Sequence, residues 1–265
     1  MKDWHQGILA KFMMEQKPSK SKVVCTFPGK LGDLLWSLPT MNAIARKHRC
    51  KIDVATSEYC RRALRFVSEQ KFVRTAFVPE GYVIQYDSWG IQPWVMPVNG
   101  YRHVYHLGFK SMPGLEDRLR DCIAREAGIE PLDFVPNFPI AEVPTPYVVV
   151  VNHHTSSTMI AIGRAIKEPK VVWLGDSADF GGHGIDGCSA DFWLSAGIIM
   201  RAEAVITNRS SNAVLAHLLG KSPITIVQPN EDYPLFRIDG EIPLDGRKPI
   251  GQLIEEVKGL LGVVP

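Results

Sequence analysis

Short apolar runs alternate with helical patterns along most of the chain, and each run ends in a polar or glycine-containing loop. The first group is complete. A run of β-forming residues at 23–27 leads into a loop with two glycines, a helical pattern from Asp33 to His48, and a second short strand at 52–55. Strand, glycine loop, helix and strand in this order open a βαβ unit, whose natural product is a buried parallel sheet.

The same rhythm restarts after a stretch with five prolines between residues 131 and 146, which marks the best domain boundary. A helix is predicted before this boundary, at 115–127. Strands and helices are predicted beyond it, with strands at 147–151, 171–174, 204–207 and 224–227 and helices at 192–200, 213–219 and 252–261. We therefore expect an α/β protein with two Rossmann-like doubly wound domains, 23–140 and 141–265, separated by an interdomain cleft.

The composition changes this picture only at the N-terminus. The 265 residues are 45% hydrophobic and 22% charged, as in ordinary globular proteins. The net charge is +2, and five lysines in the leader 1–22 give that segment +3 by itself. The rest of the chain therefore carries no nucleic-acid signal. The leader, read as a basic amphipathic helix, allows a weak peripheral contact with an anionic membrane surface.

Cysteine usage and spacing indicate a cytoplasmic protein without a metal centre. The five cysteines form no C-x-x-C pair, which favours reduced thiols over a disulfide scaffold or a zinc site. No stretch approaches the ~18 consecutive apolar residues of a spanning helix. The pairs His153–His154 and His103–His106 point apart on their strands, and no D-x-D triplet occurs, so we expect no metal.

Asp33 follows the glycine loop at the start of the first long helix. Open α/β sheets bind ligands beyond the carboxyl ends of their strands, which is where this loop lies. Two interpretations stay open. The carboxylate caps the helix by accepting free N–H groups, or it acts as a general base at the mouth of the cleft. Spacing alone favours the cap. The loop lacks the spacing of a phosphate-binding P-loop.

A second candidate site lies in the loop 208–212, between the strand 204–207 and the next helix. Small polar residues at a helix start leave backbone N–H groups free, and the helix dipole favours an anion there. Arg209 adds a guanidinium that can grip a phosphate with two hydrogen bonds. An ordinary Ser or Asn cap beside a solvated arginine explains the same residues equally well.

Four segments resemble glycosyltransferase family 9, the ADP-heptose:lipopolysaccharide heptosyltransferases, which have the two-domain GT-B fold. The segment 29–39 is similar to the family's glycine-Asp-apolar-proline opening. The helix at 115–129, the helix at 192–204 and the segment 205–227 are similar to later parts of the family pattern. The likeness is a spaced pattern over most of the chain, and it is most specific in the first and fourth segments.

The resemblance implies an inverting transfer of a hexosyl or heptosyl group from a nucleotide-diphospho-sugar to an acceptor hydroxyl, with no metal or other cofactor. Asp33 matches the family's catalytic base. The acceptor, a glycan, a lipid-linked glycan or a small molecule, is implied on the first domain at Lys30, Gly32 and Trp89. The donor is implied on the second domain, at Thr155, Ser156, Asp176, Arg209, Ser210, Ser211 and Asn212. The aromatic residues around Trp89 suit core packing as well as sugar stacking.

The chain also departs from the family pattern, and the departures support two alternatives. Arg209 stands where the family has Asp, Ser211 where it has Gly, and Val214 where it has His. These replacements favour a binding module that holds a nucleotide or sugar without turning it over. A nucleotide-sugar epimerase on the same architecture is the other alternative. Backbone N–H groups survive such side-chain changes, so the anion site at the helix start is expected in every case.

Overall fold

The computed structural model describes residues 22–79, 98, 100–107, 118–140, 143, 146–152, 157–167, 169–175, 183–184, 192–229 and 236–262. The leader up to residue 21 lies outside these residues. No helix in the described ranges is long and apolar enough to cross a membrane. The strands form two separate parallel sheets, one on each side of the proline-rich stretch.

The first sheet has four strands in the order β3-β2-β1-β4, all parallel. Its strands are β1 (Val23–Phe27), β2 (Ile52–Thr56), β3 (Val73–Phe77) and β4 (His103–His106). Its helices are α2 (Leu31–His48), the 3-10 helix η1 (Glu58–Ala63), α3 (Leu64–Ser68) and α4 (Leu119–Ala127). Every residue of β1 and β2 is buried, which explains why these strands read as continuous runs rather than alternating ones.

The second sheet has six parallel strands in the order β10-β9-β8-β5-β6-β7. Its strands are β5 (Tyr147–Asn152), β6 (Lys170–Gly175), β7 (His183–Gly184), β8 (Ala204–Thr207), β9 (Ile224–Val227) and β10 (Ile242–Asp245). Its helices are α5 (Ser157–Ala165), α6 (Phe192–Arg201), α7 (Ser211–Leu218) and α8 (Ile250–Leu260). The expected α/β architecture with two Rossmann-like sheets is thus confirmed.

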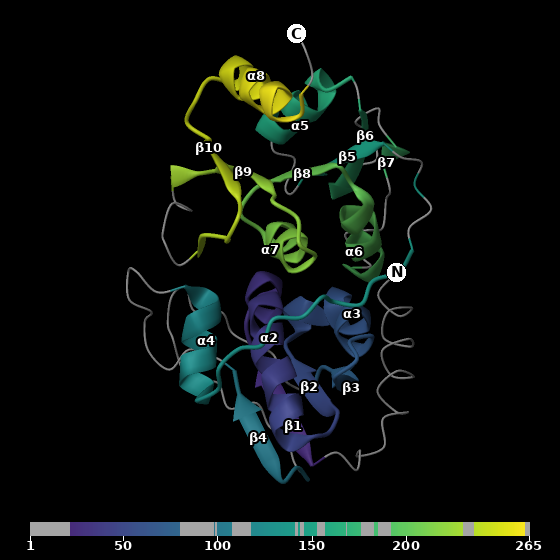
Figure 1. Cartoon of the computed structure of the whole chain (residues 1–265), viewed down its shortest axis with the longest axis vertical. Coiled ribbons are helices and arrows are strands. Elements are labelled where there is room, and N and C mark those ends of the chain that lie inside the picture. Colours follow the sequence, from purple (N-terminus) through teal and green to yellow (C-terminus); the bar gives the residue numbers. More distant parts are fainter. Residues whose placement is uncertain are drawn as a thin grey trace, which may run out of the picture.

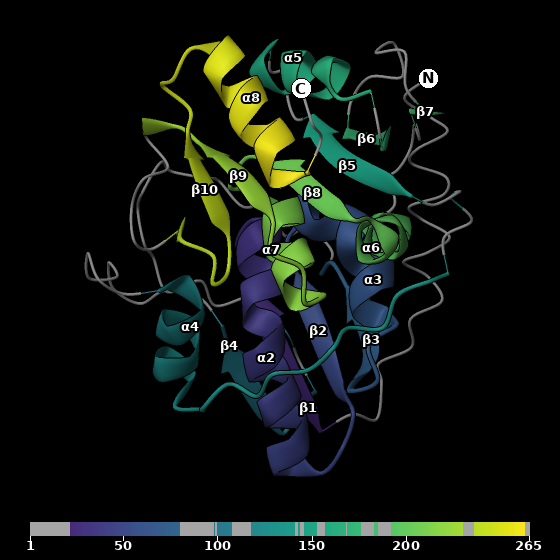
Figure 2. The same cartoon turned by 45° about the horizontal axis from the view of Figure 1, so that its top comes forward.

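Helices α2 and α3 of the first half face helices α7 and α6 of the second half (Figure 1). Helices α5 and α8 lie together on the far side of the second sheet (Figure 2). The alternation along β5 reflects this arrangement, because Val149 and Val151 join the cluster between the sheets while Val148 and Val150 join the cluster under α5 and α8. The first cluster is continuous from β1 through α2 to β5, so the two halves share one core.

The proline-rich segment packs against the helices of the first half. The N–H of Leu132 donates to the carbonyl of Pro39 at 3.2 Å, and the N–H of Asn137 donates to Oε1 of Gln70 at 2.8 Å. A Cβ on Gly197 of α6 would lie 2.5 Å from the carbonyl oxygen of Pro139, so only a glycine allows this close approach. The exact domain boundary near residue 140 stays a prediction.

Candidate functional site

The first turns of α2 and α7 lie against each other. A Cβ on Gly32 would be 3.7 Å from the Cα of Ser211, and one turn further along α2 the ring of Trp36 lies 5.2 Å from that of His217. The two helices therefore begin next to each other and remain in contact over the following turns. Each helix carries a partial positive charge at its N-terminus. Two such ends at one place make a site suited to an anion.

Asp33 lies in the first turn of α2, but this helix begins earlier than predicted. Helix α2 begins at Leu31 with Lys30 as its N-cap, so Asp33 is the third helical residue and not the residue that opens the helix. Its carboxylate accepts the backbone N–H of Lys30, which is the reach-back of a capping box. Asp33 is half-buried. Asp33 is therefore not the N-cap that the sequence suggested, although its carboxylate does accept an N–H at the helix start.

Burial is the main influence on the charge of Asp33. It raises the pKa of the carboxyl from 3.8 to about 6, although the N–H and the positive charge of Lys30 act in the opposite direction. A carboxylate with a pKa just below neutrality is ionised at pH 7 and still holds a proton well. These are the properties of a general base that works near neutral pH. Accepting the Lys30 N–H and acting as a general base are therefore compatible.

The loop before α7 is arranged differently from its sequence-based prediction in one respect. The helix starts at Ser211 rather than Ala213, with Ser210 as an extended N-cap. The Ser210 side chain makes no cap hydrogen bond, and its hydroxyl lies 3.2 Å from that of Thr207. The N–H groups of Ala213 and Val214 donate to the carbonyl of Ser210 at 3.0 and 3.2 Å, which leaves those of Ser211 and Asn212 as the first N–H groups at the N-terminus of α7.

Arg209 is held inside the protein. Its side chain is 4% exposed and forms an ion pair of 2.6 Å with Glu241, which is 6% exposed. The same carboxylate accepts the hydroxyl of Thr225 at 2.7 Å. The guanidinium charge is thus neutralised within the fold, where the sequence had suggested either a phosphate contact or a solvated side chain. Glu241 is 32 residues away in sequence, and no local motif indicated this pairing.

The remaining predicted site residues divide into two groups. Lys30 is exposed and Gly32 is half-buried, and both lie in the first turn of α2 beside Asp33. Asn212 is buried in the first turn of α7. Trp89, Thr155, Ser156 and Asp176 lie outside the described residues, so their assigned roles stay predictions. The structure places Gly32 against Ser211, so the first turn of α2, which contains Asp33, adjoins the first turn of α7, which contains Asn212.

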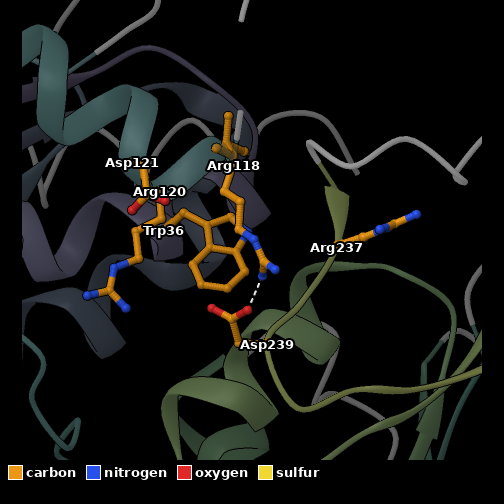
Figure 3. A pocket seen from close by; sticks show the side chains of 7 residues that line it. Trp36, Arg118, Arg120, Asp121, Arg237 and Asp239 are labelled. Atoms are coloured by element: carbon orange, nitrogen blue, oxygen red, sulfur yellow. Dashed lines mark hydrogen bonds and ion pairs between the residues drawn. The ribbon is translucent and has the colours of Figure 1, made fainter. Parts of the chain in front are cut away.

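A pocket opens one helical turn beyond Asp33, where α2, α4 and the segment 236–239 meet. Its lining consists of two apolar residues, three arginines and two aspartates, namely Trp36, Leu119, Arg118, Arg120, Arg237, Asp121 and Asp239. Figure 3 shows Arg118 reaching past the indole of Trp36 to Asp239, an ion pair that joins the two halves of the molecule. The guanidinium of Arg237 points away from the indole. The sequence did not predict this pocket, although the four charged residues among 117–121 are a visible signal.

The described residues contain no group of three or more His, Cys, Asp or Glu side chains arranged to hold a metal ion. His106 lies with Nδ1 2.7 Å from the hydroxyl of Thr26, and His103 stacks on His48 with ring centroids 4.5 Å apart. These two histidines therefore have separate neighbours. Metal independence itself remains a prediction.

No family model and no curated protein matches the sequence. Solved structures do match the fold. A glycosyl transferase family 9 protein from Veillonella parvula is 11% identical with a TM-score of 0.58, over 94% of this chain and 92% of that one. The E. coli heptosyltransferase WaaC with ADP-2-deoxy-2-fluoro heptose is 13% identical with a TM-score of 0.54, over 91% and 99%.

The iron-containing heptosyltransferase TibC, solved in complex with ADP-D-beta-D-heptose, is 14% identical with a TM-score of 0.54. The match covers 88% of this chain and 66% of that chain, so the protein spans about two thirds of the length of TibC. At these identities the similarity concerns the fold alone. The chain therefore has the two-domain Rossmann-like fold of the family 9 heptosyltransferases, as the spaced sequence pattern predicted.

Proposed function

We propose that the protein is a glycosyltransferase that moves a sugar from a nucleotide-diphospho-sugar to an acceptor hydroxyl with inversion and without a metal. One observation carries the proposal. A half-buried carboxylate with a pKa of about 6 lies in the first turn of α2, and this turn packs against the first turn of α7. Such a site can take a proton and hold an anion at the same time. The structural neighbours solved with ADP or ADP-sugars support a nucleotide-sugar as the donor.

The reaction is a single displacement. The Asp33 carboxylate takes the proton of the acceptor hydroxyl while that oxygen attacks the anomeric carbon. The bond from this carbon to the diphosphate oxygen breaks, and the nucleoside diphosphate leaves with the electron pair. Attack from the side opposite the leaving group inverts the anomeric configuration. The raised pKa of Asp33 makes the carboxylate a stronger base than an ordinary aspartate.

The departing diphosphate gains negative charge, and preorganised N–H groups stabilise such charge without reorganisation. The first turn of α7, Ser211 and Asn212, supplies these groups, with Ser210 at the N-cap. Thr155, Ser156 and Asp176 complete the proposed donor side, and Lys30, Gly32 and Trp89 the proposed acceptor side. Arg209 acts by holding this loop through Glu241. The absence of a metal requirement is tested by activity in excess chelator.

Asp33→Asn tests the base. The change removes the proton acceptor and keeps the side-chain shape, so kcat falls by about 10²–10⁴-fold, the usual contribution of general base catalysis. Donor binding is retained, and a ligand at about 100 times its Kd raises stability by roughly 2.7 kcal/mol in a thermal-shift screen. Asp245→Asn, on the edge strand β10, is the matched control and keeps full turnover. Full turnover by Asp33→Asn contradicts the proposal.

A binding module without turnover is the second candidate, and the buried Arg209–Glu241 pair favours it because the donor loop departs from the family pattern at that residue. Tight binding of a nucleoside diphosphate with no transfer to any acceptor and no hydrolysis supports the module. An epimerase is separated by product analysis with the donor alone, since it alters the sugar without an acceptor.

A further inference from the structure

The peptide group between Gly29 and Lys30 connects Asp33 to a second pair of side chains. A trans peptide is planar, and its C=O and N–H point in opposite directions. At one end the carbonyl oxygen of Gly29 accepts the hydroxyl of Ser57 at 2.8 Å and the thiol of Cys60 at 3.4 Å. At the other end the N–H of Lys30 donates to the Asp33 carboxylate. Turning this plane therefore moves the N–H away from Asp33.

Ser57 is placed for this contact in an unusual way. It is the N-cap of η1, a position where a serine normally accepts an N–H of its own helix. Here its side chain makes no cap hydrogen bond, although the residue is fully buried. The hydroxyl bonds the Gly29 carbonyl on the neighbouring strand end instead. The interaction thus serves the β1–α2 loop and not η1.

Packing and a second, weaker donor also act on this peptide. A Cβ on Gly29 would lie 2.6 Å from the ring of Phe27, so the loop is packed tightly at this residue. Burial raises the pKa of Cys60 to about 11, which keeps it a neutral thiol and a weak donor near Asp33. The bond from Ser57 is therefore the stronger of the two hydrogen bonds to the Gly29 carbonyl.

We propose that Ser57, assisted by Cys60, is a positioning residue for Asp33: it fixes the Gly29–Lys30 peptide so that the Lys30 N–H faces the carboxylate. The inference deepens the proposed function and rests on it in one respect, namely that Asp33 is the base. Hydrogen bonds in a chain polarise one another, so the bond from Ser57 also strengthens the donor at the far end of the peptide.

Loss of Ser57 has a defined effect on the charge of Asp33. The Lys30 N–H stabilises the ionised carboxylate and lowers its pKa, so weakening this bond raises the pKa above its value of about 6. A larger fraction of the enzyme is then protonated at pH 6–7. The acid limb of the kcat profile moves to higher pH, and kcat falls at pH 6 more than at pH 8.

The test uses Ser57→Ala and Ser57→Cys in the full chain, with the Asp33 pKa followed by ¹³C NMR of labelled aspartate and by the pH profile of kcat. In Ser57→Ala the pKa rises by up to about one unit, which is the effect of losing the Lys30 hydrogen bond to the charged carboxylate completely. Ser57→Cys keeps a weak donor of similar size and shifts the pKa less. An Asp33 pKa within about 0.2 units of wild type in Ser57→Ala overturns the proposal.

Ser37→Ala is the matched control. Ser37 is also fully buried, but its hydroxyl donates to the carbonyl of Leu34 at 2.6 Å inside α2. This variant loses stability without moving the Asp33 pKa, which separates positioning from general destabilisation. The NMR titration needs no turnover. An unshifted pKa in Ser57→Ala refutes the positioning role, whereas full activity of Asp33→Asn refutes the base.

Discussion

Helices α2 and α7 begin next to each other, yet their first turns are completed in opposite ways. Helix α2 has an acid in its first turn, and Asp33 accepts the N–H of its own N-cap. Helix α7 has no acid in its first turn and no side-chain cap, and the charge of the preceding Arg209 is paired with Glu241. The N-terminus of α2 is thus matched by the carboxylate of Asp33, whereas the N-terminus of α7 has no acidic side chain and can accept a bound anion.

The comparison also shows which physical effect dominates at α2. A helix N-terminus favours an ionised acid by about 0.3–1 kcal/mol, which lowers its pKa by less than one unit. The pKa of Asp33 is nevertheless raised, from 3.8 to about 6. Desolvation therefore outweighs both the dipole and the Lys30 N–H. The packing of α7 against α2 at Gly32 contributes to removing water from this region.

The largest expected effect concerns the structural role of Arg209. Arg209→Met leaves Glu241 buried without its cation and costs about 3–5 kcal/mol of unfolding free energy, measured by urea denaturation. The double variant with Glu241→Gln regains most of this loss, because Gln still bonds Thr225 without a charge. A loss below about 1 kcal/mol, within the range of a surface ion pair, together with weaker nucleotide binding, would mean that the guanidinium faces the ligand.

A smaller effect is expected from giving α7 the acid that α2 already has. Ser211→Asp places a carboxylate in the first turn of α7, next to Gly32 and Asp33. It competes with a bound diphosphate and weakens ADP binding by about 30-fold, equivalent to the ~2 kcal/mol of a favourable helix-terminus charge. Gly251→Asp, in the first turn of α8, adds the same charge elsewhere and leaves Kd unchanged in calorimetry. Equal Kd values of the two variants for ADP would contradict an anion site at the N-terminus of α7.

The smallest effect is on stability and comes from Asp33 itself. Its pKa is higher in the folded protein than in the unfolded chain, so the proton-linked stability is present below about pH 3.8 and is lost as pH rises through about 6. Asp33→Asn removes this penalty. The variant is therefore more stable than wild type by about 1–2 kcal/mol at pH 7.5, and the difference disappears near pH 4. If the stability difference between Asp33→Asn and wild type does not change with pH, the Asp33 carboxyl is exposed to water.

The periodic parts of the fold could be read from the sequence. The strands 204–207 and 224–227 have the predicted bounds, and β5 and β6 extend the predicted ones by one residue or two. These strands are buried on both faces, which gives long apolar runs. The elements η1, α3, β3, α5, β7 and β10 were not predicted. Strand β10 has only one buried residue, Leu244, and therefore leaves no periodic signal.

The sequence could predict which residues belong to the candidate site, but it could not predict which side chains they contact. Asp33 and the serines before α7 follow strand ends, and the rule for open α/β sheets places such residues at one edge. Ser57 and Glu241 gave no comparable signal, because each acts on a partner about 30 residues away in sequence. The Ser57–Gly29 hydrogen bond and the Arg209–Glu241 ion pair depend on tertiary packing, which the pattern of a single sequence does not reveal.

The apolar cluster between the sheets determines how the chain folds as well as how it is built. It joins Leu34 and Leu38 of α2 to Val149 of β5 and Leu215 of α7, so neither half has a closed interior by itself. A fragment that ends within the proline-rich segment would expose this face and aggregate. The chain should instead melt as one cooperative unit, with coincident transitions by tryptophan fluorescence and circular dichroism.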